Sequence, residues 1–238
     1  METEYIWWET IKMIRCYVMC EGQTEETFIR DVIAPLLLPQ KISLIATFPN
    51  HRAGNFKYAR VKPEIIKFLK QETTIFITTF CDLYALDNEF PSFSESQKQQ
   101  DVYDKVAILE QGFKNDIAKE NQLYAKRFIP YIQPYEFEGL LFTDISKVTA
   151  IETAWNKSTK TLQSIRDNAK SPEHINDGYD TKPSERLKKH LPSPKYDKIL
   201  HGTLAIEAIG IDKLLEECQH FKQWYNQLLK LGHECSKQ

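Results

Sequence analysis

The segment from residue 73 to residue 81, Thr-Thr-Ile-Phe-Ile-Thr-Thr-Phe-Cys, constrains the fold more than any other part of this chain. It carries no charge and consists almost entirely of β-branched and aromatic residues, as expected of a strand covered on both faces. Two similar runs precede it at residues 13–20 and 42–48, and a fourth, broken by Pro130, follows at residues 127–133. Strands of this kind are typical of parallel sheets.

The segments between these strands have helical periodicity. Apolar residues recur at helical spacing in residues 24–38, 58–70 and 95–121, and Pro35 should kink or shorten the first of these helices. The order β-α-β-α-β-α-β with crossover helices predicts an α/β fold. We expect a mainly parallel, four-stranded sheet with helices on both faces.

The sequence changes character after Asp144, where it becomes polar and helical and is punctuated by prolines. We therefore predict two parts, an α/β domain over residues 13–144 and a helical C-terminal region over residues 145–238. No flexible linker separates the two parts, so we expect the helical region to pack on the sheet.

Composition narrows the class of function. Among the 238 residues, 42% are hydrophobic and 27% charged, as in an ordinary globular protein, and no apolar run approaches the ~20 residues of a membrane span. The five cysteines show no paired spacing, which favours a reducing cytoplasm over a disulfide framework. With a net charge of -2, any contact with nucleic acid needs a local basic patch. No phosphate-binding loop of an ATPase occurs, so any ATP dependence must come from another chain.

Acidic residues follow three of the predicted strands. Glu21 and Glu25 flank the turn after the first strand, Asp82 follows the third, and Glu136 and Glu138 follow the fourth. In a parallel sheet the ends of the strands gather along one edge, so these side chains are expected to converge. Converging carboxylates repel unless a divalent cation compensates, and Mg²⁺ or Mn²⁺ suits a site made of oxygen ligands. Two such ions about 4 Å apart could activate water for attack on a phosphodiester.

Each of these carboxylates also has a simpler interpretation. Acidic residues after strands are frequent at helix N-termini, where they cap the helix or interact favourably with its dipole. Glu25 and Glu26 suit that role well. For Glu21 and Asp82 together we favour the metal site, because each directly follows an uncharged stretch of a predicted strand, residues 16–20 and 73–81.

Basic residues concentrate between residues 182 and 198, and a smaller group follows the second strand near the same edge of the sheet. A basic run is usually a solvated face. Here it is the one concentrated positive patch in an acidic chain, so contact with a phosphate backbone is the better hypothesis. The predicted nucleic-acid-binding residues are Arg52, Lys57, Arg60, Lys182, Arg186, Lys188 and Lys189.

Two further groups leave alternatives open. Cys218, His220, His233 and Cys235 have a spacing that permits a tetrahedral zinc site, but a buried cysteine and histidine in the last helix are the simpler interpretation. His174 could cap a helix, or it could lie near the metal edge together with Asp177.

Several motifs in combination resemble a known family. They are Glu-Gly-Gln-Thr-Glu-Glu at 21–26, Asp82 with Tyr84 and Pro91 beyond it, Tyr-Glu-Phe-Glu-Gly-Leu-Leu-Phe at 135–142, Pro-Glu-His-Ile-Asn-Asp at 172–177, Tyr196-Asp197-Lys198 with Gly202, and Cys218-Gln219-His220-Phe221 followed by Trp224. From about residue 14 to 230 the chain resembles the bacterial family catalogued as domain of unknown function 4276. That family is grouped with Toprim-like domains and is similar to the nuclease domains of overcoming-lysogenization-defect proteins.

The resemblance implies a Toprim-type sheet and a Mg²⁺-dependent nuclease, often working beside a separate ATPase subunit in phage defence. By this resemblance Glu21 matches the invariant Toprim glutamate, Glu25 the second acidic residue of that turn, and Asp82 the first aspartate of an Asp-x-Asp motif. Lys198 resembles a lysine that neutralises transition-state charge in related nucleases. Glu21, Asp82 and Lys198 are thus the expected catalytic residues.

One departure from the family pattern keeps a second function open. Tyr84 stands where the motif has its second aspartate. Asp87 could compensate for it, or Glu136 and Glu138 could supply the missing ligands. Loss of the ligand would instead favour a catalytically weak module that binds and regulates a partner ATPase. Phosphoryl transfer on a small nucleotide would use the same chemistry as cleavage of DNA or RNA.

Overall fold

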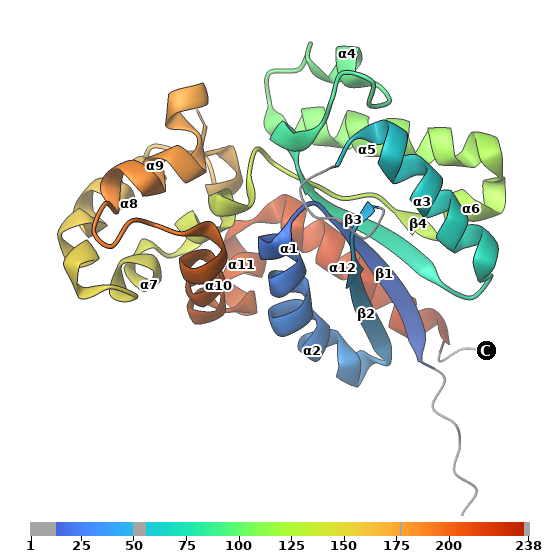
Figure 1. The fold of residues 1–238 in the computed structure, drawn as a ribbon, viewed down its shortest axis with the longest axis horizontal. Coiled ribbons are helices and arrows are strands. Elements are labelled where there is room, and N and C mark those ends of the chain that lie inside the picture. Colours follow the sequence, from blue (N-terminus) through green and yellow to red (C-terminus); the bar gives the residue numbers. More distant parts are fainter. Residues whose placement is uncertain (1–12, 50–55, 177, 236–238) are drawn as a thin grey trace, which may run out of the picture.

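The computed structural model describes residues 13–49, 56–176 and 178–235, and its fold is shown in Figure 1. Within these residues one parallel sheet has the strand order β2-β1-β3-β4, and β5 also pairs with β3. The strands are β1 (Ile14–Cys20), β2 (Ile42–Thr47), β3 (Phe76–Asp82), β4 (Phe128–Ile129) and β5 (Ile132–Gln133). The predicted α/β fold with a mainly parallel sheet is confirmed.

The expected fourth strand is divided into β4 and β5 by Pro130. Proline has no N–H to donate to the ladder, so pairing with β3 is interrupted there. The hydroxyl of Thr79 bridges the gap, since it accepts a hydrogen bond from Tyr131 N and donates one to Tyr131 O, both at 2.8 Å. The chain can thus pass Pro130 and resume parallel pairing at Ile132.

Helices cover both faces of the sheet (Figure 1). On one face, Met19 and Ile77 pack in a hydrophobic cluster with residues of α3 (Tyr58–Gln71) and α5 (Val102–Glu120). On the opposite face, α12 (Gln219–Cys235) and the helical segments after β1 cover the sheet. These segments are α1 (Gln23–Thr27), the π-helical η1 (Phe28–Ile33), α2 (Ala34–Leu37) and the 3₁₀ turn η2 (Leu38–Gln40).

Two predicted helices are interrupted in the structure. The helix expected at 24–38 changes to π-helical geometry just before Pro35, which has no N–H to continue regular pairing. The helix expected at 95–121 is two helices, the short α4 (Phe93–Ser96) and α5. A new helix begins because the Asp101 carboxylate caps α5 by accepting a hydrogen bond from Tyr103 N at 2.8 Å.

The predicted helical C-terminal part is confirmed, and its helices from α7 (Ile145–Ala150) to α10 (Lys198–Ile209) lie beside the sheet (Figure 1). One hydrophobic cluster joins Phe80 of β3 to Trp155 and Trp224 of the C-terminal part, and Trp224 Nε1 donates to Thr78 Oγ1 at 2.8 Å. A domain boundary between residues 144 and 145 stays a prediction.

The remaining elements are η4 (Leu83–Ala85), α6 (Gln122–Lys126), η5 (Phe137–Thr143), α7 (Ile145–Ala150), η6 (Thr153–Ser158), α8 (Thr159–Asp167), η7 (Pro172–His174), η8 (Tyr179–Thr181), α9 (Pro183–His190), α10 (Lys198–Ile209) and α11 (Ile211–Glu217). None of the helices in the described ranges is both long and apolar enough to cross a membrane.

Candidate functional site

The ends of β1 and β3 bring two acidic residues together. These strands are neighbours in the sheet, with Cys20 opposite Phe80, and Glu21 N donates to Phe80 O at 3.2 Å. Asp82 is the last residue of β3, and its backbone N–H donates to Glu21 Oε2 at 3.0 Å. The Glu21 carboxylate is therefore fixed beside Asp82 by the backbone of the adjacent strand.

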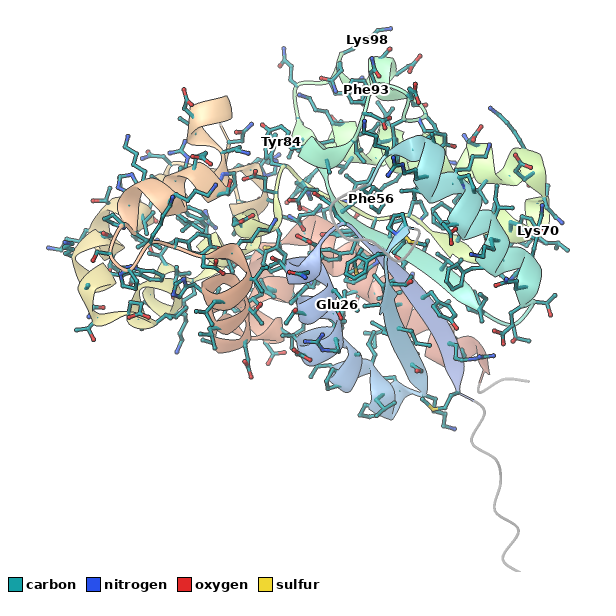
Figure 2. All side chains as sticks on the ribbon, in the orientation of Figure 1. Glu26, Phe56, Lys70, Tyr84, Phe93 and Lys98 are labelled. Atoms are coloured by element: carbon teal, nitrogen blue, oxygen red, sulfur yellow. The ribbon has the colours of Figure 1, made fainter. Side chains whose placement is uncertain are left out.

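The ammonium group of Lys198 contacts three carboxylates at this edge of the sheet. Its Nζ atom is 3.2 Å from Glu25 Oε1, 3.4 Å from Asp82 Oδ2 and 3.4 Å from Glu138 Oε2. Glu25 belongs to α1, where Figure 2 labels the next residue, Glu26; Glu138 belongs to η5 and Lys198 begins α10. We refer to Glu21, Glu25, Asp82 and Glu138 as the carboxylate cluster.

Local backbone structure holds this cluster in place. Asp82 Oδ1 accepts a hydrogen bond from Phe137 N at 2.8 Å, which ties the end of β3 to the start of η5. A Cβ at Gly22 would lie 2.8 Å from Glu25 Oε2, so glycine is what allows Glu25 to fold back over the turn after β1. Asp197 caps α10 by accepting from Leu200 N at 2.7 Å, which fixes the start of the helix that carries Lys198.

Burial and mutual repulsion disfavour the ionised carboxylates. Burial, followed by the charge of Glu25, raises the pKa of Glu21 to about 7. Burial also raises the pKa of Asp82 well above its ordinary value and raises that of Glu138. Burial alone would lower the pKa of Lys198, but Asp82, Glu138 and Glu25 hold it well above its usual range. One ammonium cannot neutralise four carboxylates, so the cluster has an unmet demand for positive charge.

The chemistry of the cluster fits a hard divalent cation. Buried Glu25 Oε1 and Glu138 Oε2 make no hydrogen bond within the part of the chain that the structure describes. Carboxylate oxygens of this kind are the preferred ligands of Mg²⁺ and Mn²⁺. A cavity of about 400 Å³ opens beside Glu21, Glu25 and Lys198. No three His, Cys, Asp or Glu residues among those described already form a metal-binding group, and Lys198 Nζ lies where the oxygens converge.

Glu136, also predicted as a metal ligand, points away from Lys198. Its Oε1 is 2.8 Å from Lys182 Nζ, and its Oε2 accepts a hydrogen bond from Ser184 N at 3.0 Å, at the start of α9. Asp87, considered as a replacement ligand, accepts a hydrogen bond from Tyr58 N at 3.1 Å at the start of α3. Neither carboxylate is brought to Lys198 in this arrangement.

Tyr84, where the family resemblance led us to expect an aspartate, follows Asp82 by two residues. It belongs to η4, and its side chain is labelled in Figure 2. Its backbone N–H donates to Tyr135 O at 3.3 Å, and its hydroxyl accepts a hydrogen bond from Asn176 Nδ2. The residue is 46% exposed, so it offers solvent an aromatic ring in place of a carboxylate.

The predicted nucleic-acid-binding residues do not form one group of free cations. Lys57 and Arg60 are exposed at the start of α3, and Lys188 and Lys189 are exposed on α9. Lys188 pairs with Glu185 at 2.8 Å. Arg52 lies outside the described residues. Lys182 is engaged with Glu136, as noted above.

Arg186 makes its contacts within the C-terminal part rather than at the carboxylate cluster. Its Nε donates to Thr181 O, and it lines a cavity of about 370 Å³ together with His174 and Asn176. His174 itself contacts Ser171 Oγ at 2.7 Å and Asp101 at 3.4 Å, rather than the carboxylate cluster. Asp177, its predicted companion, lies outside the described residues.

Cys218 and His220 are buried in the core. Cys218 Sγ is 3.3 Å from Thr143 Oγ1, and His220 Nε2 is 2.9 Å from Glu110 Oε1. The structure does not describe the side chains of His233 and Cys235, which a zinc site would need. The simpler interpretation, a buried cysteine and histidine, is what the structure shows for the first pair.

Sequence analysis missed two buried polar groups. Glu173 accepts hydrogen bonds from His220 N, Phe221 N and Tyr103 OH at 2.9, 3.0 and 2.7 Å, so it anchors the start of α12. The buried Tyr196 hydroxyl makes no hydrogen bond within the described residues, and a Cβ at Gly202 would lie 2.9 Å from it. Both residues stand inside motifs quoted above, which was the available signal.

Two solved structures of the C-terminal region of the OLD protein from Xanthomonas campestris pv. campestris, phased with iodine and with mercury, are similar to the chain. Their sequence identities are 15% and 14%, their TM-scores 0.41 and 0.40, and the matches cover 93% and 92% of this chain and 98% of each of those chains. No curated protein matches the chain.

A family model, described as Domain of unknown function (DUF4276), matches residues 20–229. The match begins at the last residue of β1, directly before the acidic turn, and ends within α12, so it includes the whole carboxylate cluster and Lys198. The predicted family is therefore confirmed: the chain belongs to the DUF4276 family.

Proposed function

We propose that the protein is a metal-dependent phosphodiesterase, a nuclease that cleaves DNA or RNA with Mg²⁺ or Mn²⁺. The convergence of Glu25, Asp82 and Glu138 on Lys198 at the carboxyl edge of the sheet, with Glu21 held beside Asp82, carries this proposal. Buried groups with strongly perturbed pKa values beside a cavity are typical of functional sites. A divalent ion held by the cluster would supply Lewis-acid chemistry, which activates water and neutralises charge on phosphate oxygens.

The chain itself pre-organises this site. Backbone N–H groups of Asp82 and Phe137 fix the carboxylates of Glu21 and Asp82, so little reorganisation is needed when a substrate binds. Lys198 stays protonated at neutral pH because its carboxylate neighbours raise its pKa. Its side chain is 35% exposed, so the ammonium can reach a phosphate at the mouth of the cavity and stabilise the negative charge of the transition state.

The wider context is proposed from the family resemblance. We place the protein in a bacterial, cytoplasmic phage-defence system in which a separate ATPase subunit works beside it. Cations at the start of α3 and around α9 would guide nucleic acid toward the carboxyl edge of the sheet. We propose this role for Lys57, Arg60, Lys182, Arg186, Lys188 and Lys189.

A second function is favoured by one observation. Lys198 already pairs with three carboxylates, and Tyr84 replaces an acidic residue, so the cluster has fewer free ligands than a complete Asp-x-Asp site would have. A catalytically weak module that binds and regulates a partner ATPase would tolerate such a loss. Under this alternative the cluster would be mainly structural.

Cleavage of plasmid DNA and of labelled RNA in Mn²⁺ or Mg²⁺ tests the proposal. Wild type should cut, whereas Glu21→Gln and Asp82→Asn should not. Glu26→Gln is the matched control, because it makes the same chemical change one residue from Glu25 on a side chain that pairs with Arg30 instead. Folded wild-type protein that binds Mn²⁺ but cuts neither substrate, with or without the partner ATPase, would reject the nuclease and support the regulatory module.

A further inference from the structure

Tyr84 is unusual among the aromatic residues of this protein. Of the phenylalanine, tyrosine and tryptophan side chains whose exposure the structure describes, it is the one that is exposed, at 46%. It follows Asp82 by two residues, so its Cα lies within about 7 Å of the Cα of a cluster residue. The residue that carries this exposed ring is thus close in the chain to one of the proposed catalytic carboxylates, Asp82.

The Tyr84 ring is held in place rather than left free. The hydroxyl accepts a hydrogen bond from Asn176 Nδ2, and the backbone N–H donates to Tyr135 O at 3.3 Å. One side of the ring packs against Tyr135, with ring centroids 5.6 Å apart and an interplanar angle of 46°. A ring fixed at both ends loses little conformational entropy when it binds a flat ligand.

The partner of Tyr84 has an unusual backbone. Tyr135 has φ of +56°, in the left-handed region that bulky residues rarely occupy. Such conformations persist where the surrounding structure holds them, and they cluster at functional sites. Here the strained residue directly precedes Glu136 and η5, which carries Glu138. The same short segment therefore supports the Tyr84 ring and delivers a carboxylate to the cluster.

The surroundings of the ring suit nucleic acid. Lys182, which pairs with Glu136, and Asn176, which holds the Tyr84 hydroxyl, offer cationic and hydrogen-bonding groups beside an exposed aromatic face. Single-stranded nucleic acid is bound by this combination, in which bases stack on aromatic rings while cations contact the backbone. A base inside a duplex has both faces covered and cannot stack on a protein side chain.

We propose that Tyr84 is a stacking platform for an unpaired nucleobase, so that the substrate at the carboxylate cluster is single-stranded DNA or RNA. This inference rests on the proposed nuclease function, which it refines by naming the substrate class. Tyr84 acts as a positioning residue: it fixes the strand so that a neighbouring phosphate lies over Lys198. An aromatic ring that contacts the substrate thus stands where the family resemblance led us to expect a metal ligand.

Binding measured without divalent metal tests this proposal separately from cleavage. The probes are fluorescein-labelled oligothymidylate and oligouridylate of about ten nucleotides and a hairpin duplex of similar charge, titrated by anisotropy in EDTA. Wild type should bind the single strands more tightly than the duplex. Tyr84→Ala should weaken single-strand binding about tenfold and change duplex binding by less than about twofold. Comparing the two single-stranded probes shows whether DNA or RNA is preferred.

Two control variants separate stacking from other effects. Tyr84→Phe keeps the ring and should retain single-strand binding within about threefold, although it loses the contact with Asn176. Leu123→Ala removes another exposed apolar side chain, 59% exposed on α6, and should change nothing. Photocrosslinking of an oligonucleotide that contains 5-iodouracil should label the peptide carrying Tyr84. Equal single-strand affinity for wild type and Tyr84→Ala would overturn the platform while leaving the nuclease proposal intact.

Discussion

The ammonium nitrogen of Lys198 lies 3.4 Å from Asp82 Oδ2, although 116 positions separate the two residues in the chain. Asp82 is the last residue of β3, and Lys198 is the first residue of α10. The helical C-terminal part therefore contributes directly to the site at the edge of the sheet. Neither the sheet alone nor the helices alone contain the full set of interacting charges.

Removal of the Lys198 charge should affect both activity and stability. In Lys198→Met we expect the cleavage rate to fall about 100-fold, since one stabilising group for the transition state is lost. The free energy of unfolding should fall by about 2 kcal/mol without metal. This is less than for a fully buried pair, because the lysine side chain is 35% exposed. Single-turnover cleavage and urea unfolding measure the two effects.

Lys213→Met is the control for that experiment. Lys213 pairs with Glu216 and Glu217 on the surface of α11, so its loss should leave both stability and cleavage almost unchanged. A Lys198→Met protein that cuts at the wild-type rate would remove Lys198 from the proposed mechanism.

Stability without metal should decrease as pH rises from about 4.5 to about 7. The pKa of Glu21 is about 7 in the folded protein, against an ordinary value of 4.5. Between these values the folded chain keeps a proton that the unfolded chain has lost, so rising pH favours unfolding, by at most about 1.4 kcal/mol per pH unit for this group. The raised pKa values of Asp82 and Glu138 act in the same direction.

Urea unfolding in EDTA at several pH values measures this dependence. Glu21→Gln should make the free energy of unfolding less dependent on pH, while Glu26→Gln should keep the wild-type slope. If Glu21→Gln has the same slope as wild type, Glu21 does not hold the proton that the pKa assigns to it.

Divalent metal should stabilise the protein through the carboxylate cluster. Mn²⁺ or Mg²⁺ at about 100 times its Kd should raise the free energy of unfolding by about 2.7 kcal/mol, because it binds the folded state selectively. Asp82→Asn and Glu138→Gln should each remove most of this gain, and Glu26→Gln should keep it. Thermal unfolding with and without metal measures the effect; equal gains in all four proteins would place the metal elsewhere.

Glu173→Gln should reduce stability without affecting metal binding. The carboxylate accepts two hydrogen bonds from the start of α12 and one from the Tyr103 hydroxyl on α5, and replacing one oxygen with NH₂ sets a donor against a donor. We expect a loss of about 2 kcal/mol in the free energy of unfolding and an unchanged Kd for Mn²⁺. A changed Kd with unchanged stability would mean that Glu173 belongs to the site rather than to the core.

The sequence predicted the parts of the site that depend on strand order. An uncharged run that ends in an acidic residue indicates where a parallel strand reaches the edge of the sheet, and this placed Glu21 beside Asp82 correctly. Lys198 was found through the family resemblance instead. Its position depends on how α10 packs on α1 and η5, and no local pattern predicts such a contact.

Side-chain direction was the main limit of sequence reasoning. Glu136 and Glu138 are two residues apart, yet Glu138 contacts Lys198 and Glu136 contacts Lys182. The backbone between them enters the 3₁₀ helix η5, which changes the direction of successive side chains. The sequence predicted that an acidic segment reaches the edge, but not which of its carboxylates would turn toward Lys198.

The packing of α12 against the sheet also has a consequence for synthesis on the ribosome. Chains are made from the N-terminus, and early segments can fold before later ones emerge. Here the cover over β3 is incomplete until Trp224 is available to pack against Phe80 and bond to Thr78. Lys198, which contacts Asp82, also belongs to a late segment, because it begins α10. A growing chain therefore cannot complete the set of charges around Asp82 until α10 has been made, so this site forms only after most of the described chain has left the ribosome.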